Sequence, residues 1–191
     1  MKEIFLIIYE FIINSVSSST VWGPILASIL IILESIIPVL PLFVFITVIF
    51  LAYGNILGFI ISWICTCIGC LISYLLVKYL TNKYIKTNSK KLNNLIKVIN
   101  KIDYSNLVVL IAIPFTPAFL INIACGMSKI DIKKFMSAIM IGKISLVWFW
   151  GFIGTSLIES LKDPVILIKV LLVVLIMFII SKVYSKKMKI D

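Results

Sequence analysis

The sequence contains neither histidine nor arginine, and only eight of its residues are acidic. The absence of histidine excludes Ser–His catalysis, and no cluster of carboxylates offers a metal site for hydrolysis instead. Intramembrane aspartyl catalysis needs two facing carboxylates within the membrane, whereas Asp103, Asp131 and Asp163 all fall at the edges of predicted helices. We therefore expect that the chain is not an enzyme.

Charged residues are scarce as a class, at 14% of the chain, whereas hydrophobic residues make up 62%. Soluble domains average about 25% charged and about 45–50% apolar residues. A soluble fold could not bury this much apolar surface, so lipid must be the solvent. We expect an all-α integral membrane protein, because each crossing helix needs about 20 apolar residues.

All 18 basic residues are lysines, and the net charge is +10. They lie between hydrophobic segments, where they would meet lipid headgroups and set the topology. We expect anionic lipid headgroups as partners, and no nucleic acid. The abundance of Ile, Lys and Asn is typical of an AT-rich bacterial genome, which indicates the bacterial cytoplasmic membrane.

Four cysteines are present, three of them in one apolar segment with the spacing C-x-C-x-x-C: Cys65, Cys67, Cys70 and, apart from these, Cys125. A metal site is one reading of this spacing. Cysteine is also a small apolar residue that packs well, and no disulfide framework is visible. We expect these thiols to be packing residues, with no metal and no other cofactor.

The first apolar segment, Ile4–Val16, is short for a membrane span. It resembles the start of a signal peptide, but Glu10 interrupts it and no A-x-A-like cleavage site follows. We expect it to be retained, with Ile4–Thr20 either crossing the membrane or lying at its surface.

Residues 25–54 form two short apolar pieces, separated by Pro38 and Pro41 and closed by Gly54. Neither piece can cross about 30 Å of hydrocarbon, and the prolines interrupt the helix. We predict a re-entrant hairpin here, followed by a full span at Ile56–Val77. That span carries small residues at helical spacing, where another helix can approach closely: Ser62, Thr66, Gly69 and Ser73.

Residues 107–126 repeat this pattern, with Pro114 and Pro117 between two short apolar pieces and Gly126 at the end. The two proline pairs are 76 residues apart (114 − 38 and 117 − 41). Each pair is followed by a long helix, the second near Phe135–Leu157. This is an internal repeat.

A basic connector joins the repeats, and its apolar residues recur at helical spacing: Leu92, Leu95, Ile96, Ile99 and Ile102. The pattern predicts an amphipathic helix on the membrane surface with its lysines toward the headgroups. A solvated linker helix is the alternative.

We expect one membrane domain over residues 1–191. Its parts are a first half (1–80, re-entrant at 25–54), a connector (81–104), a second half (105–158, re-entrant at 107–126) and a final span (164–184).

The lysines also predict how the repeats are oriented. If residues 107–126 are re-entrant, the 78–101 stretch, the 129–134 patch and the C-terminus all lie on the cytoplasmic side, as the positive-inside rule requires. If Ile4–Thr20 crosses, the N-terminus is cytoplasmic as well and the first hairpin enters from the opposite face. About four spans and two opposed re-entrant hairpins are typical of inverted-repeat transporters, whose broken helices form the substrate site.

Two blocks of the sequence resemble those of the DedA-like, VTT-domain family, also called the SNARE-associated Golgi protein family. The first block is Leu33–Pro41 with Gly54–Phe59, and the second is Ile113–Pro117 with Asn122, Gly126, Lys129–Phe135 and Ile141–Lys143. The similarity covers roughly residues 20–160.

The resemblance implies opposed re-entrant helices and movement of lipids between leaflets. Bacterial members are linked to recycling of polyprenyl-phosphate carriers or phospholipids, coupled to ion gradients, and eukaryotic relatives are scramblases. Many members carry an arginine three residues before the proline that matches Pro114, where this chain has Ile111. Either Lys143 takes over the role of that arginine, or the substrate differs.

Three residues are candidates for substrate binding or ion coupling. Glu34 is a carboxylate in an apolar helix one turn before a break, so it is either a proton carrier or a structural hydrogen-bonding group. Lys143 lies too deep for an interfacial lysine and could bind a phosphate, pair with Glu34 or extend toward the interface. Asn122 could donate to phosphate or to a backbone carbonyl freed by the break.

The sequence thus favours a flippase or scramblase for an anionic lipid such as polyprenyl phosphate or phospholipid. Coupling of the lipid movement to protons is compatible with this function. The alternatives are a membrane scaffold or assembly factor, and a small-solute transporter. Assembly of the chain into a homo-oligomer is compatible with the sequence.

Overall fold

The computed structural model describes residues 22–37, 41–83, 90–160 and 163–188, and every regular element in these ranges is helical. In chain order the helices are α2 (Trp22–Glu34), α3 (Leu42–Lys83), α4 (Lys90–Lys101), α5 (Tyr104–Ala112), α6 (Ala118–Gly126), α7 (Ile132–Glu159) and α8 (Pro164–Lys187). The all-α prediction is confirmed.

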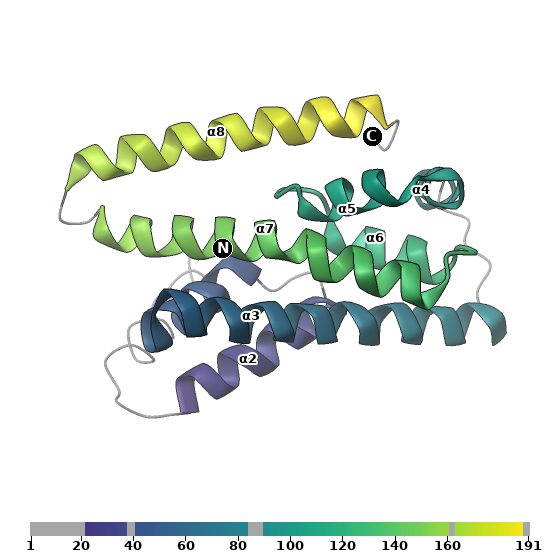
Figure 1. Ribbon diagram of the computed structural model, residues 1–191, viewed down its shortest axis with the longest axis horizontal. Helices are drawn as coiled ribbons and strands as arrows, with labels where there is room; N and C mark the ends of the chain where they lie inside the picture. Colours follow the sequence, from purple (N-terminus) through teal and green to yellow (C-terminus); the bar gives the residue numbers. More distant parts are fainter. Residues whose placement is uncertain (1–21, 38–40, 84–89, 161–162, 189–191) are drawn as a thin grey trace.

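Three helices of the described ranges are long and apolar enough to cross a membrane: Leu42–Thr81, Ile132–Glu159 and Val165–Lys187. They run side by side, with α7 between α3 and α8 (Figure 1). The fourth predicted span, Ile4–Thr20, lies outside the described residues, as does Pro38.

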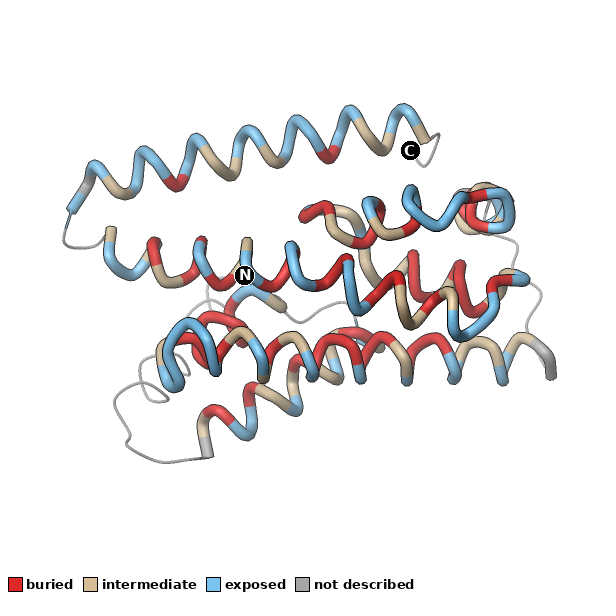
Figure 2. The backbone as a smooth tube through the Cα atoms, viewed as in Figure 1, coloured by how far each residue is buried: buried red, intermediate tan, exposed pale blue. Residues whose placement is uncertain are grey.

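Burial differs sharply among these three helices. The apolar stretch of α8 is 11% buried, against 44% for those of α3 and α7. Figure 2 shows α8 mostly exposed, with intermediate residues and few buried ones, whereas buried residues run along the facing sides of α3 and α7. Since exposed leucines and isoleucines are unfavourable in water, α8 requires lipid as its solvent.

The first proline-containing segment lies between two short helical pieces. The helix α2 has 13 residues, and a second piece runs from Leu42 to a kink at Gly54. Gly54 has φ 74° and ψ 177°, a conformation that is open essentially to glycine alone. A Cβ at this position would meet nothing within 4 Å, so backbone conformation, not space, requires the glycine.

The second segment has the same order of parts. Helices α5 and α6 have nine residues each, and Pro114 and Pro117 lie between them. The piece after each proline pair begins at an equivalent position, since Leu42 and Ala118 are 76 residues apart (118 − 42). Gly126 ends α6 close to α3, because a Cβ there would lie 2.9 Å from the Tyr74 carbonyl oxygen.

The stripe of small residues on α3 is buried. Ser62 and Thr66 are fully buried, and Ser73 is nearly so. A Cβ on Gly69 would lie 2.6 Å from Oγ of Ser35 and 2.9 Å from the carbonyl oxygen of Ile32, so the end of α2 packs directly on this glycine. The prediction that another helix approaches closely at this stripe is therefore confirmed.

The apolar face of helix α4 was expected to lie against the membrane surface, but it packs against other helices of the protein. Leu95, Ile99 and Ile102 are buried in a core cluster with residues of α3, α5, α6 and α7. The apolar stripe is therefore covered by protein. Lys134 adds to this attachment, because its Nζ donates to the carbonyl oxygen of Ile102 at 3.1 Å.

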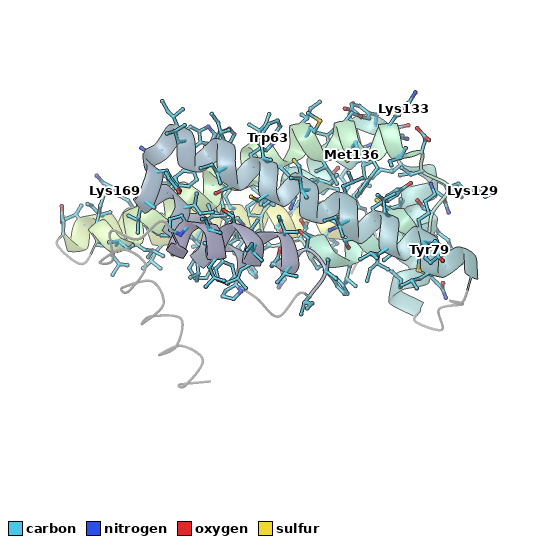
Figure 3. All side chains as sticks on the ribbon, turned by 90° about the horizontal axis from the view of Figure 1, so that it is seen from below. Trp63, Tyr79, Lys129, Lys133, Met136 and Lys169 are labelled. Atoms are coloured by element: carbon cyan, nitrogen blue, oxygen red, sulfur yellow. The ribbon has the colours of Figure 1, made fainter. Side chains whose placement is uncertain are left out.

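The basic segments gather at one end of the long helices. The backbone N–H of Lys129 donates to Asn100 Oδ1 at 2.9 Å, and Tyr184 of α8 donates to the carbonyl oxygen of Asn106 at 3.2 Å. Figure 3 places Lys129 and Lys133 at this end and Lys169 at the opposite end.

Candidate functional site

Lys143 lies in the interior of α7 and is only 2% exposed. It follows Gly142, where a Cβ would lie 2.8 Å from Cγ2 of Ile111 and 2.9 Å from the carbonyl oxygen of Val108. Helix α5 can therefore pack directly on α7 beside the lysine. An ammonium group buried among apolar helices is costly, and such groups normally serve a partner, an ion or a cavity.

A small cavity adjoins this lysine. Its volume is about 10 Å³, close to the space that one water molecule needs. Residues of α5, α6, α7 and the turn between α5 and α6 line it: Ile111, Thr116, Ala118, Ile121, Asn122 and Lys143. The structure thus brings Lys143 and Asn122 together.

Asn122 is 3% exposed and makes a contact that differs from both predicted alternatives. Its Nδ2 donates to Sγ of Cys70 at 3.4 Å, and Sγ of Cys70 lies 3.9 Å from Oγ of Ser35. Through Cys70 on α3, the chain segment that follows Glu34 is connected to α6.

Glu34 is the last residue of α2 and is half-buried. The charge of Lys143 acts electrostatically on the Glu34 carboxyl group, and also on the thiol of Cys67. No ion pair within 4 Å joins Glu34 and Lys143 in the part of the chain that the structure describes. The two groups are therefore close enough for an electrostatic interaction but do not form an ion pair.

The turn between α5 and α6 has its own polar contacts. The hydroxyl of Thr116 is within hydrogen-bonding distance of the carbonyl oxygens of Ile113 (2.7 Å) and Leu110 (3.1 Å). These carbonyls lie at the C-terminal end of α5, where helical partners are missing. Thr116 thus stabilises the end of α5 while it lines the cavity.

Sequence reasoning did not identify Cys70 or Thr116 as parts of the site. Cys70 was interpreted as a packing residue, and its burial in the core agrees with that. Its position next to Gly69, a member of the stripe of small residues, was the available signal of a polar contact with a second helix. For Thr116, the signal was a hydroxyl between two prolines.

The arrangement offers one buried cation, one amide and one carboxyl group, each from a different helix. Such a set can bind an anion at Lys143 and Asn122, and can exchange a proton at Glu34. Within the described residues, no three His, Cys, Asp or Glu side chains are placed to share a metal ion.

Comparison with known proteins agrees with this architecture. A sequence profile of the VTT domain matches residues 37–156. The chain is also similar to the uncharacterized membrane protein YhjE of Bacillus subtilis (strain 168). The two are 26% identical over 165 residues, which cover 84% of this chain and 79% of that protein. No solved structure matches. With the profile matching more than half of its length, the chain belongs to the VTT-domain family of membrane proteins.

Proposed function

We propose that this protein is a lipid transporter of the bacterial cytoplasmic membrane, without enzymatic activity, that moves an anionic lipid between leaflets. The observation that carries the proposal is the burial of Lys143, at 2% exposure, beside a cavity that it shares with Asn122. A buried cation next to an amide donor suits the phosphate of a polyprenyl phosphate or a phospholipid, which would enter once the helices around the cavity of about 10 Å³ move apart. Membership of the VTT-domain family is consistent with this substrate class.

The position of Ile111 supports the assignment of Lys143. Many family members have an arginine at the position of Ile111, and Ile111 lines the same cavity as Lys143. A cation supplied from α7 would therefore reach the space that an arginine on α5 would reach. We infer that Lys143 takes the place of that arginine in binding the headgroup.

Glu34 is the proposed coupling residue. Its carboxyl group interacts electrostatically with Lys143, so protonation of Glu34 would change the field at the headgroup site. Conversely, an anion bound at Lys143 would favour the neutral form of a nearby carboxyl group. This reciprocal effect is what coupling of lipid movement to a proton gradient requires.

We further propose that the two proline-containing segments are re-entrant hairpins of an inverted repeat. In Figure 1, α2 and the start of α3 lie toward one end of the long helices, whereas α5 and α6 lie toward the other. Broken helices at membrane depth are tolerated where protein or a cavity covers them. The lysine-rich end would then be cytoplasmic, together with both termini.

Lipid binding to the purified protein tests the headgroup assignment. Native mass spectrometry would compare retention of phosphatidylglycerol with that of phosphatidylcholine, for the wild type and for Lys143→Met. We expect preferential retention of the anionic lipid by the wild type and loss of the preference in the variant. Equal retention of both lipids by the wild type would argue against an anionic headgroup site and favour a small solute or a scaffolding role.

A further inference from the structure

The backbone of Phe115 is strained. It has φ 68°, the left-handed region that non-glycine residues rarely adopt, and it is the one non-glycine residue with positive φ in the described chain. Phe115 sits between Pro114 and Thr116 in the α5–α6 turn, and its side chain is 39% exposed. Such a conformation is unfavourable for a residue with a side chain and persists only where neighbouring groups hold it.

Aromatic rings on two other helices contact this residue. The Phe115 ring centroid lies 5.3 Å from that of Trp150 and 6.1 Å from that of Phe149, both on α7. It lies 5.8 Å from the ring of Phe178 on α8. All three pairs are edge-to-face, the favoured geometry for aromatic pairs.

Trp150 also contacts the other repeat. Its ring lies 5.9 Å from that of Phe43, which follows Pro41 by two residues at the start of α3. Trp150 is thus in contact with residues beside both proline pairs. It lies two helical turns beyond Lys143, on the same face of α7.

We propose that Trp150 is a positioning residue for the Lys143–Asn122 site. Through Phe115 it holds the α5–α6 turn in its strained form, so that Thr116 and Ala118 close the cavity beside Lys143. Through Phe43 it ties the start of α3 to the same point of α7. A movement of either half-helix is therefore transmitted to the other at Trp150. The significance for lipid movement rests on the proposed function, but the positioning itself does not.

Trp148 provides a matched control. It lies on the same helix and is 46% exposed, whereas Trp150 is half-buried, and its replacement by leucine removes the same side-chain atoms. Its ring contacts are with Phe50 and Phe59, at 6.0 and 5.1 Å, and both belong to α3. A general loss of helix packing would follow from either substitution, whereas displacement of the α5–α6 turn would follow only from that of Trp150.

The test is the reactivity of a cysteine placed at the cavity. Ala118→Cys would be labelled with a small methanethiosulfonate reagent in proteoliposomes, with the parent chain as the background because Cys65, Cys67, Cys70 and Cys125 are buried. Adding Trp150→Leu is expected to raise the labelling rate by about tenfold, since the ring contacts of Trp150 with Phe43, Phe115 and Phe149 are lost. Trp148→Leu should leave the rate unchanged, and Trp150→Phe should restore it to within about twofold.

Equal labelling rates in the Trp150→Leu and Trp148→Leu backgrounds would overturn the proposal. If Trp150→Leu does not fold, Phe115→Ala takes its place, because the ring contacts are lost while the strained backbone conformation still has to be held. This variant should also raise the labelling rate by about tenfold, and an unchanged rate would contradict the role of the aromatic contacts.

Lipid translocation by Trp150→Leu and Trp150→Phe separates this inference from the proposed function. We expect Trp150→Leu to raise the half-saturating lipid concentration more than it lowers the maximal rate, with Trp150→Phe restoring it. A wild type that moves no lipid would contradict the proposed function, while the labelling experiment would still decide the role of Trp150.

Discussion

Ile111 of α5 and Lys143 of α7 line the same cavity of about 10 Å³. They are brought together by Gly142, where any larger residue would collide with the Ile111 side chain. The cation of this site therefore comes from α7, although the adjacent position on α5 could also supply one.

Moving the cation across the cavity should preserve part of the activity. We expect Lys143→Met to abolish lipid translocation and the added change Ile111→Arg to restore a measurable fraction of it, because the charge returns to the same space. The measurement is the translocation rate in proteoliposomes.

Lys169→Met is the control for this exchange. Lys169 is exposed on α8, at the end opposite Lys129 and Lys133 (Figure 3), so its loss should leave the translocation rate unchanged. A double variant as inactive as Lys143→Met, although folded, would mean that the position of the lysine matters and not only its charge.

The hydrogen bond between Asn122 and Cys70 should contribute to stability. Asn122→Ala is expected to lower the free energy of unfolding by about 0.5–1.5 kcal/mol, because one buried hydrogen bond is lost and the thiol left behind is only a weak hydrogen-bonding group. Cys70→Ala should cost less when Asn122 is already absent, with a coupling energy of about 0.5–1 kcal/mol. Unfolding in mixed micelles with increasing dodecyl sulfate measures both values. Cys65→Ala serves as the uncoupled control, and equal coupling for both cysteines would contradict the contact.

Gly54 should resist every substitution, although there is space around it. We expect Gly54→Ala to cost about 1–3 kcal/mol, because φ 74° with ψ 177° is unfavourable for any residue with a Cβ. The measurement is again the free energy of unfolding, with Asn55→Ala as the exposed neighbouring control. A Gly54→Ala variant as stable as the wild type would contradict the positive φ at this kink.

Helix α4 should behave as part of the protein core. Leu95 is 2% exposed, so Leu95→Ala is expected to cost about 2–5 kcal/mol of unfolding free energy. Lys97→Ala, on the exposed face of the same helix, should change it by less than about 0.5 kcal/mol. A Leu95→Ala variant as stable as the wild type would contradict this packing and would mean that lipid, not protein, covers the apolar face of α4.

Much of this architecture follows from sequence alone. The broken helices were predicted from the lengths of the apolar segments and from the two proline pairs, which are 76 residues apart. Lys143 was identified because it lies far from the ends of the apolar helix α7. Periodicity also predicted α4 as an amphipathic helix. It could not tell whether protein or lipid covers the apolar face, because both bury the same side chains.

Contacts between helices were harder to predict. The bond from Asn122 to Cys70 depends on the rotation of α6 against α3, which no local pattern specifies. The ring contacts of Trp150 with Phe43 and Phe115 likewise join residues that are distant in sequence. A tryptophan in an apolar helix has no periodic signal that separates such a role from ordinary exposure to lipid.

The most direct test of the central claim is lipid translocation in liposomes that contain the purified protein. Labelled phospholipid and polyprenyl phosphate would be followed for the wild type, Glu34→Gln and Lys143→Met, with and without a proton gradient. We predict movement of at least one of these lipids by the wild type, loss of movement in Lys143→Met, and loss of the response to the gradient in Glu34→Gln. Folded wild-type protein that moves neither lipid would contradict the account.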